Sequence, residues 1–314
     1  MSTLSIVTPV YNEEESITNF YTEVVKNTQE LDLDLEIIFC VDPSTDRTTS
    51  IIEEICRKDE RIKMIIFSKR VGQDLALMAG LEHASGDCVV LMDSDLQDPP
   101  TLLPELVQNW NNGSQIVLAQ RTSRDGENFI KIFTSKLFYK FMRKFSDSNF
   151  PENTGDFRLI DREVVNKIIE HKEQQPFMRA VMSSVGYEIT TIGFERPKRF
   201  IGKTKYSPLF GGYKIAFKSV VNYSNLLLKL NLIIGLTMAS ISFLFALIFV
   251  TAKILGADFA SGVTTIVFSI WFLGGVILTS IGTVGLYVDK ILNEVKLKPR
   301  YIIAKSFGFK TGNE

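Results

Sequence analysis

Asp93 and Asp95 are the residues in this sequence best suited to bind a metal ion. They stand at positions i and i+2 in Asp93-Ser94-Asp95, which follows the apolar run Val89–Met92 and precedes Pro99-Pro100. Two carboxylates so spaced at a strand end can converge on one hard cation, and oxygen ligands of this kind suit Mg²⁺ or Mn²⁺. Such an ion neutralises charge that develops on a phosphate leaving group. An Asp-x-Asp pair is common in loops, and its place after a strand makes this prediction specific.

Other chemistries are disfavoured by the composition. The three cysteines, Cys40, Cys56 and Cys88, form no close-spaced pair, and Cys40 and Cys88 lie in apolar runs that predict burial. An odd number of cysteines without a disulfide framework fits a reducing compartment. With His83 and His171 as its two histidines, the chain is a poor candidate for a histidine-rich zinc site or a Ser-His-Asp triad. We expect no nucleic-acid partner.

The elements that must position Asp93 and Asp95 alternate between strands and helices. In order they are strand Leu4–Val10, helix Glu13–Glu30, strand Leu35–Val41, helix Asp46–Arg57, strand Ile62–Phe67, helix Gly72–Ala84 and strand Cys88–Met92. Continuous apolar strands separated by helices predict an α/β domain whose mainly parallel sheet is covered on both faces. Ligands of such sheets bind beyond the carboxyl ends of the strands. That rule selects Pro9–Glu13, Asp42–Asp46 and Asp93–Asp98.

Two long uncharged runs near the C-terminus predict two transmembrane helices. One lies between Lys229 and Lys253 and the other between Asp258 and Asp289. Each exceeds the roughly 20 apolar residues needed to cross a bilayer. The alternative, a pair of buried core helices, is disfavoured because core helices are usually shorter and amphipathic.

The charge of the chain is divided unevenly, although its net value is −1. Residues 1–129 carry 10 basic and 23 acidic residues, a balance of −13, and residues 130–314 carry 25 and 13, a balance of +12. A basic half that also holds both apolar runs favours attraction to anionic lipid or phosphate over a merely solvated surface. Lysines and arginines flank the two runs on their outer sides, and few lie between them. The positive-inside tendency then places both long flanks in the cytoplasm and the connector outside.

Two further segments, Ile130–Phe145 and Tyr206–Tyr223, mix apolar, aromatic and basic residues. This pattern is typical of helices in the membrane interface, and packing on the sheet is the alternative. The chain is therefore divided into a catalytic domain at 1–205, a juxtamembrane segment at 206–228, two membrane spans within 229–288 and a cytoplasmic tail at 289–314.

Taken in order, several motifs resemble those of family 2 glycosyltransferases with the GT-A fold, a Rossmann-like α/β fold. They are SIVTPVYNEEESI, VDPSTDRT, DSDLQDPP and NTGDFRLIDREVV, followed by the two apolar runs. More narrowly, the chain resembles the polyprenyl-phosphate, or bactoprenol, glucosyltransferases, which are bacterial relatives of dolichol-phosphate mannose synthase. The resemblance covers nearly the whole chain. It implies an inverting, Mg²⁺- or Mn²⁺-dependent enzyme of the cytoplasmic membrane that moves a hexose from a nucleotide sugar to undecaprenyl or another polyprenyl phosphate.

The resemblance also implies roles for single residues. In the family the first-strand motif contacts the nucleotide, which carries over to Pro9, Tyr11 and Glu13, with Tyr11 near the base. Asp93 and Asp95 match the metal and diphosphate acids. The remaining matches are Gln97 as a further metal ligand, Asp42 in the donor site and Arg121 at the diphosphate.

Asp156 matches the acid that the family places near the acceptor, and with Asp95 it is a candidate catalytic residue. A hydroxyl acceptor needs a general base. A phosphate monoester is already largely anionic near pH 7, so Asp156 could instead orient the acceptor or complete the metal shell. The structural alternative is a turn or cap aspartate, whereas the neighbouring glycine and arginine favour a loop of the site. Arginine and lysine suit the phosphate, and the candidates are Arg124, Arg199, Lys203 and Lys205.

Two departures from the family pattern bear on the donor. The usual Asp-Asp-Gly-Ser loop is Val41-Asp42-Pro43-Ser44 here, and Gln73 stands where relatives usually carry a lysine. These departures could shift the choice of donor. The resemblance makes UDP-glucose the first choice and UDP-N-acetylglucosamine the second. A processive polysaccharide synthase is disfavoured because the chain has no Gln-x-x-Arg-Trp motif. A non-catalytic membrane scaffold with a nucleotide-sensing domain is the rival from another class. The sequence leaves open whether the chain forms a homo-oligomer.

Overall fold

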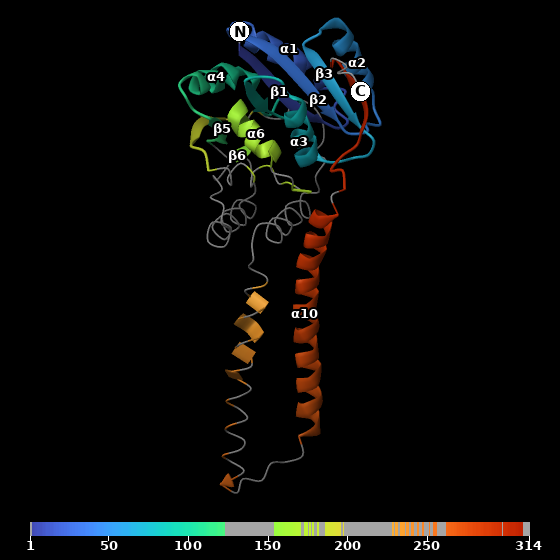
Figure 1. The fold of residues 1–314 in the computed structure, drawn as a ribbon, viewed down its shortest axis with the longest axis vertical. Coiled ribbons are helices and arrows are strands. Elements are labelled where there is room, and N and C mark those ends of the chain that lie inside the picture. Colours follow the sequence, from blue (N-terminus) through green and yellow to red (C-terminus); the bar gives the residue numbers. More distant parts are fainter. Residues whose placement is uncertain are drawn as a thin grey trace. The chain divides into compact units, whose positions relative to one another are not determined.

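The chain divides into two compact units, which Figure 1 draws together. One comprises Met1–Tyr139, Ser148–Ser207 and Lys298–Glu314, and the other comprises Lys140–Asp147 and Pro208–Leu297. The computed structural model describes residues 2–122, 154–170, 186–195, 262–296 and 298–309, and single positions within 173–181, at 197 and within 228–255.

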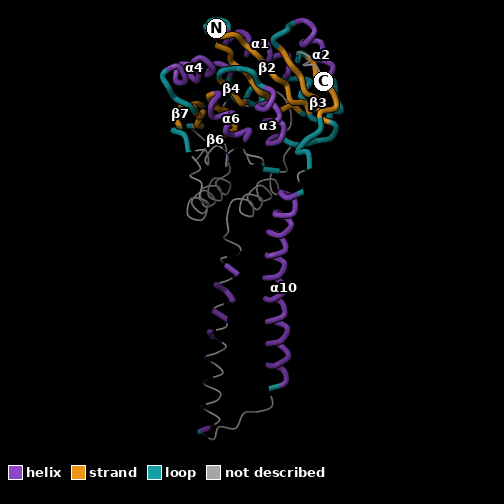
Figure 2. The backbone as a smooth tube through the Cα atoms, viewed as in Figure 1, coloured by secondary structure: helices purple, strands orange, loops and turns teal. Residues whose placement is uncertain are grey.

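The first unit is built on a sheet whose described strands run in the order β7-β5-β6-β4-β1-β2-β3-β8. Figure 2 shows these strands in orange. Their bounds are β1 Ser2–Val10, β2 Leu33–Val41, β3 Ile62–Phe67, β4 Cys88–Leu91, β5 Ile116–Arg121, β6 Thr154–Asp161, β7 Ile189–Phe194 and β8 Ile303–Phe307. The four central strands, β4, β1, β2 and β3, are mutually parallel. The prediction of a mainly parallel α/β sheet is confirmed.

Helices cover both faces of the sheet because its strands are apolar on both sides. Val7 and Ile38 point to one face, where they pack with Leu77 of a helix, whereas Ile6 and Phe39 point to the other. Helices α1, α2 and α4 pack on the face of Phe39, and α3 and α6 pack on that of Val7. The helix bounds are α1 Ile17–Thr28, α2 Thr48–Lys58, α3 Gln73–His83, α4 Leu103–Asn111 and α6 Arg162–Glu170, with a 3₁₀ turn at Pro100–Leu102.

Helix α3 approaches the sheet closely at Gly80. A Cβ at this position would lie 2.1 Å from Val7 Cγ1 and 2.9 Å from Cys40 Sγ, so any larger residue would push the helix away from β1 and β2. Because α3 is held at this distance, its first residue, Gln73, has a fixed place near the carboxyl ends of the strands.

Strand β6 runs antiparallel between β4 and β5, with Leu91 opposite Arg158 and Leu118 also opposite Arg158. The sequence placed Asp156 in a loop of the site, and this prediction was wrong because Asp156 lies within β6. The polar residues of the segment hid its extended conformation. Asp156 lies just beyond Arg158, where the pairing with β4 ends, and within the register shift between β5 and β6.

Strand β8 lies antiparallel to β3, with Met64 opposite Phe307. The sequence did not predict this strand, which falls in the segment assigned to a C-terminal tail. The Tyr301 hydroxyl donates to Glu82 at the end of α3, and the Tyr301 ring lies edge-on to Phe67 with centroids 5.6 Å apart. Arg300 adds an ion pair to Glu82 at 3.4 Å. These contacts fasten the segment to the catalytic sheet.

The second unit contains α10, Val263–Val295, whose large apolar side chains are exposed on every side of the helix. A helix that is apolar all round requires an apolar environment, such as a bilayer. Among the described residues, one helix, Phe272–Val295, is long and apolar enough to cross a membrane. The earlier run is described only at single positions, so two spans remain a prediction. The segments Ile130–Phe145 and Tyr206–Tyr223, expected to be interfacial, lie outside the described residues.

Candidate active site

The loops that follow β1 and β2 are joined by hydrogen bonds. The Asn12 N–H donates to Ser44 Oγ at 3.1 Å, and the Thr45 N–H donates to Asn12 Oδ1 at 2.8 Å. The Glu13 N–H donates to Thr48 Oγ1 at 2.8 Å. Asn12 has a φ of 51°, a conformation that few residues other than glycine adopt readily. These hydrogen bonds hold the loops after β1 and β2 together at the carboxyl edge of the sheet.

Asp42 connects these two loops to the loop before α3. Its side chain is 4% exposed, and its two oxygens accept the N–H groups of Val71 at 2.8 Å and Gly72 at 3.1 Å. Gly72 has a φ of 85°, which allows the chain to turn into the helix. The residue predicted to bind the donor therefore also fixes the position of Gln73.

The three first-strand candidates lie at the same edge. The Arg70 guanidinium lies 4.0 Å from the centre of the Tyr11 ring, a cation–π contact. Glu13 Oε2 accepts the Ser16 hydroxyl at 2.9 Å, at the start of α1. Pro9 lies beyond the last residue of β1 that pairs with β4, Val7, and is partly exposed. The Tyr11 ring thus presents an aromatic surface at this edge, with a cation already against it.

The loop that carries Asp93 and Asp95 is compact. Asp98 is 2% exposed, and its Oδ2 accepts the Asp93 N–H at 3.0 Å. Asp95 is 7% exposed, and its Oδ1 accepts the Gln97 N–H at 3.1 Å. Leu96, between them, has a φ of 60°, which costs on the order of 1–3 kcal/mol for a residue that is not glycine. Sequence reasoning assigned Asp98 no role, and its buried carboxylate is what shapes the loop.

Gln73 joins the two halves of the site. Its Nε2 donates to Asp93 Oδ1 at 3.0 Å and to Asp156 Oδ2 at 3.0 Å. Gln73 Nε2 therefore links the first residue of α3 to the loop after β4 and to strand β6. Asp93 and Asp156, selected from separate motifs of the sequence, are thus brought together by one side chain.

Arginines support Asp156 from its own strand and from β5. Arg158 is 2% exposed, and its Nη2 donates to the Gly155 carbonyl at 2.7 Å and lies 3.5 Å from Asp156 Oδ1. A Cβ on Gly155 would lie 3.1 Å from Arg121 Nη2, which places Arg121 beside the same stretch of β6. Arg158 thus places positive charge next to Asp156, and Arg121 lies beside the neighbouring Gly155. The predicted phosphate-binding residues Arg124, Arg199, Lys203 and Lys205 lie outside the described residues.

The carboxylates at this edge of the sheet suit a hard divalent cation as ligands. No group of three or more His, Cys, Asp or Glu suited to a metal occurs among the residues that the structure describes. Mg²⁺ usually takes only one or two protein carboxylates, and water and substrate phosphate supply its other ligands. Asp93 and Asp95 meet that smaller requirement, with Gln97 on the same loop.

The cysteines contribute no nucleophile. Burial raises the pKa of Cys88 to about 12, with Asp161 adding to the effect, and burial raises the pKa of Cys56 to about 11. Burial raises the pKa of Cys40 further still. Protonated thiols are weak nucleophiles, so the chemistry of this edge belongs to its carboxylates. The prediction that Cys40 and Cys88 are buried is confirmed.

The fold and the acidic edge are those of an α/β protein with a candidate cation site at the carboxyl ends of its parallel strands. A solved structure of glucosyl-3-phosphoglycerate synthase from Mycobacterium tuberculosis, in complex with Mn²⁺, UDP and phosphoglyceric acid, has this fold. It superposes with a TM-score of 0.50 at 20% identity, over 70% of this chain and 76% of that one. Residues 5–169 match the model of glycosyl transferase family 2, and the chain belongs to that family.

Two relatives match over nearly their whole length. The SfII prophage-derived bactoprenol glucosyl transferase of Shigella flexneri is 39% identical over 307 residues, which cover 96% of this chain and 98% of the relative. The uncharacterized glycosyltransferase YkcC of Bacillus subtilis (strain 168) is 37% identical over 307 residues, which cover 97% and 94%. The present chain is a glycosyltransferase.

Proposed function

We propose that this enzyme transfers a hexose from a nucleotide sugar to a polyprenyl phosphate at the cytoplasmic face of the membrane. UDP-glucose is the first choice of donor and UDP-N-acetylglucosamine the second. The full-length similarity to a bactoprenol glucosyl transferase supports the acceptor, and the apolar helix α10 supports a membrane location.

The observation that carries the proposal is the convergence of Asp93 and Asp156 on Gln73. Asp93 belongs to the loop that suits a cation and a diphosphate, and Asp156 matches the acid expected near the acceptor. A transferase must bring its two substrates together at one point, because positioning supplies much of its rate acceleration. Two carboxylates with separate expected roles and one shared hydrogen-bond donor meet that requirement.

In the proposed reaction an oxygen of the lipid phosphate attacks the anomeric carbon from the face opposite the nucleotide. The new carbon–oxygen bond forms as the bond to the nucleotide diphosphate breaks, so the sugar inverts in a single displacement. The diphosphate leaves with the bonding electron pair. Asp93 and Asp95 would hold Mg²⁺ or Mn²⁺, which would supply charge neutralisation there.

A phosphate monoester near pH 7 attacks without losing a proton. Asp156 therefore acts by orienting the acceptor, and Arg121, beside Gly155, places positive charge close to the transferred group. The Tyr11 ring offers a stacking surface for the base, with Arg70 on its face at 4.0 Å.

The test is a membrane assay with undecaprenyl phosphate, Mg²⁺ or Mn²⁺ and a panel of labelled nucleotide sugars. We expect one donor, first UDP-glucose, to give a labelled product that is extracted into organic solvent. The Asp95→Ala variant should lose this product, whereas Asp34→Ala, at an exposed position on β2, should retain it. If no donor gives such a product, the proposed reaction is wrong, and unchanged activity in Asp95→Ala would favour a different site or a scaffold role.

The orientation is tested with sealed vesicles, because a nucleotide sugar does not cross a bilayer. Inside-out vesicles should make the product from externally added donor, and right-side-out vesicles should not. The reverse result would place the catalytic domain on the outer face.

A further inference from the structure

The segment 70–74 follows β3 and includes the first two residues of α3, and it contacts Tyr11, Asp42, Asp93 and Asp156 of the candidate site. Arg70 covers Tyr11, and the N–H groups of Val71 and Gly72 bind Asp42. Gln73 binds the two acids, and Asp74 Oδ1 accepts the Met178 N–H at 3.1 Å. A change in this segment is therefore transmitted to the nucleotide side and the acceptor side together.

Gln73 differs from Arg70 and Asp74, the other residues of this segment with polar side chains, in that its side chain is uncharged. The amide nitrogen carries two hydrogens, which allows it to donate to two acceptors at once. The oxygens of Asp93 and Asp156 that it binds lie at most twice 3.0 Å apart. Two carboxylates so close repel each other, and a neutral donor holds them in place without cancelling their charge.

We infer that Gln73 is a positioning residue that sets the cation affinity of the site. Its amide aligns Asp93 with Asp156 and leaves both carboxylates charged for a divalent ion. A lysine in the same place would add a positive charge against the ion, and a glutamate would add a negative one. The inference rests on the proposed function only in that the cation bound is the one the transfer reaction uses.

The first test measures Mn²⁺ binding directly, by electron paramagnetic resonance of free Mn²⁺, in the full chain in detergent. Neither donor nor acceptor is present, so failure of the proposed transfer reaction leaves the measurement readable. Charges a few ångströms apart at a partly exposed site interact strongly enough to change affinity by about tenfold or more. We expect the Mn²⁺ dissociation constant to rise by at least about tenfold in Gln73→Lys and to fall in Gln73→Glu.

The second test uses Gln73→Met, which preserves the length of the side chain and removes both donors. We expect kcat to fall about tenfold, with the donor KM within about threefold of wild type, because alignment of Asp156 matters most during transfer. A role in folding alone would lower the melting temperature and leave the kcat of the folded fraction unchanged.

Gln108 is the matched control, because it is an exposed glutamine on α4. The substitutions Gln108→Lys, Gln108→Glu and Gln108→Met should leave Mn²⁺ binding and kcat at wild-type values. Equal Mn²⁺ affinity across the three Gln73 variants and wild type would overturn the inference, as would absence of Mn²⁺ binding by the wild-type chain. A Gln73→Met enzyme with wild-type kcat would overturn the positioning role.

Discussion

The carboxylate of Asp42 holds the backbone of Gly72, 3.1 Å away, in the turn that begins α3. Asp42 directly follows β2, and Gly72 precedes the helix whose first side chain reaches the two acids of the site. The buried carboxylate of Asp42 therefore holds this turn in place, in addition to any contact it makes with the sugar donor.

Replacing Asp42 with asparagine should therefore destabilise the enzyme and weaken donor binding together. An amide keeps one acceptor oxygen and turns its NH₂ group toward a backbone N–H, which leaves a buried donor without an acceptor. We expect a loss of about 1–3 kcal/mol in the free energy of unfolding, measured by urea denaturation in detergent. Asp34→Asn, at an exposed position on the same strand, should change it by less than about 0.5 kcal/mol. Equal stability of the two variants would contradict the structural role.

Asp156→Asn should slow the transfer without changing its pH dependence. The acceptor attacks as a phosphate, whose second pKa is about 6, so the rate should fall on the acid side of that value in both enzymes. The amide retains an oxygen for Gln73 but loses the negative charge. We expect kcat/KM to fall about tenfold to a hundredfold. Loss of the acid limb in the variant would instead identify Asp156 as a general base.

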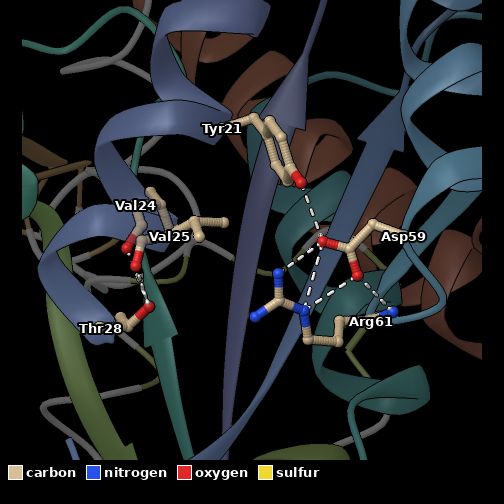
Figure 3. A network of polar contacts seen from close by, with 6 residues as sticks. All are labelled: Tyr21, Val24, Val25, Thr28, Asp59 and Arg61. Carbon is tan, nitrogen blue, oxygen red and sulfur yellow. Dashed lines mark hydrogen bonds and ion pairs between the residues drawn. The ribbon is translucent and has the colours of Figure 1, made fainter. Parts of the chain in front are cut away.

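Asp59 should contribute stability that is lost in acid. Figure 3 shows its carboxylate between Tyr21 and Arg61, with Arg61 Nη2 at 2.7 Å and the Tyr21 hydroxyl at 2.9 Å. The hydrogen bond from Arg61 outweighs burial and lowers the pKa of Asp59 to about 2. The folded pKa lies below the unfolded value of about 3.9, so the contribution is present above pH 4 and is lost as the pH falls toward 2.

The Arg61 side chain is 47% exposed, so solvent limits this contribution to about 1 kcal/mol or less. Denaturation of wild type and Asp59→Asn at pH 5 and pH 2.5 measures it. The difference in unfolding free energy between the two proteins should shrink at the lower pH. A difference that stays constant or grows would show that the ion pair is not its source.

Tyr301 should stabilise the catalytic sheet through two separable contacts. Tyr301→Phe removes the hydroxyl that binds Glu82 and keeps the ring against Phe67, so we expect a loss of about 1 kcal/mol. Tyr301→Ala removes both contacts and should cost more than Tyr301→Phe, because it also removes the ring packed against Phe67. Thermal unfolding in detergent ranks the variants, and an alanine variant as stable as the phenylalanine one would show that the ring contributes nothing.

The central strands could be predicted from the sequence because they are apolar on both faces. Leu35–Val41 and Cys88–Met92 read as continuous buried strands and lie within one or two residues of the observed β2 and β4. The carboxyl-end rule then located Asp42, Asp93 and Asp95 at one edge without any knowledge of the coordinates.

Strand β6 and the role of Gln73 were harder to predict, for different physical reasons. Strand β6 contains Asp156 and Arg158, and a charged pair inside a strand looks like a loop until the carbonyl partners of the arginine are known. Gln73 carries no charge, so composition gives no sign of it. Relatives usually carry a lysine at this position, which marks it in the sequence. Only the structure shows that Gln73 donates to both Asp93 and Asp156.

The last strand of the sheet is encoded after the apolar helix. Strand β8 begins at Ile303, whereas α10 ends at Val295. A ribosome therefore finishes the helix before it makes the strand that covers the open edge of β3. Until β8 is made, β3 has one unpaired edge, so the sheet cannot be completed before the apolar helix has been synthesised.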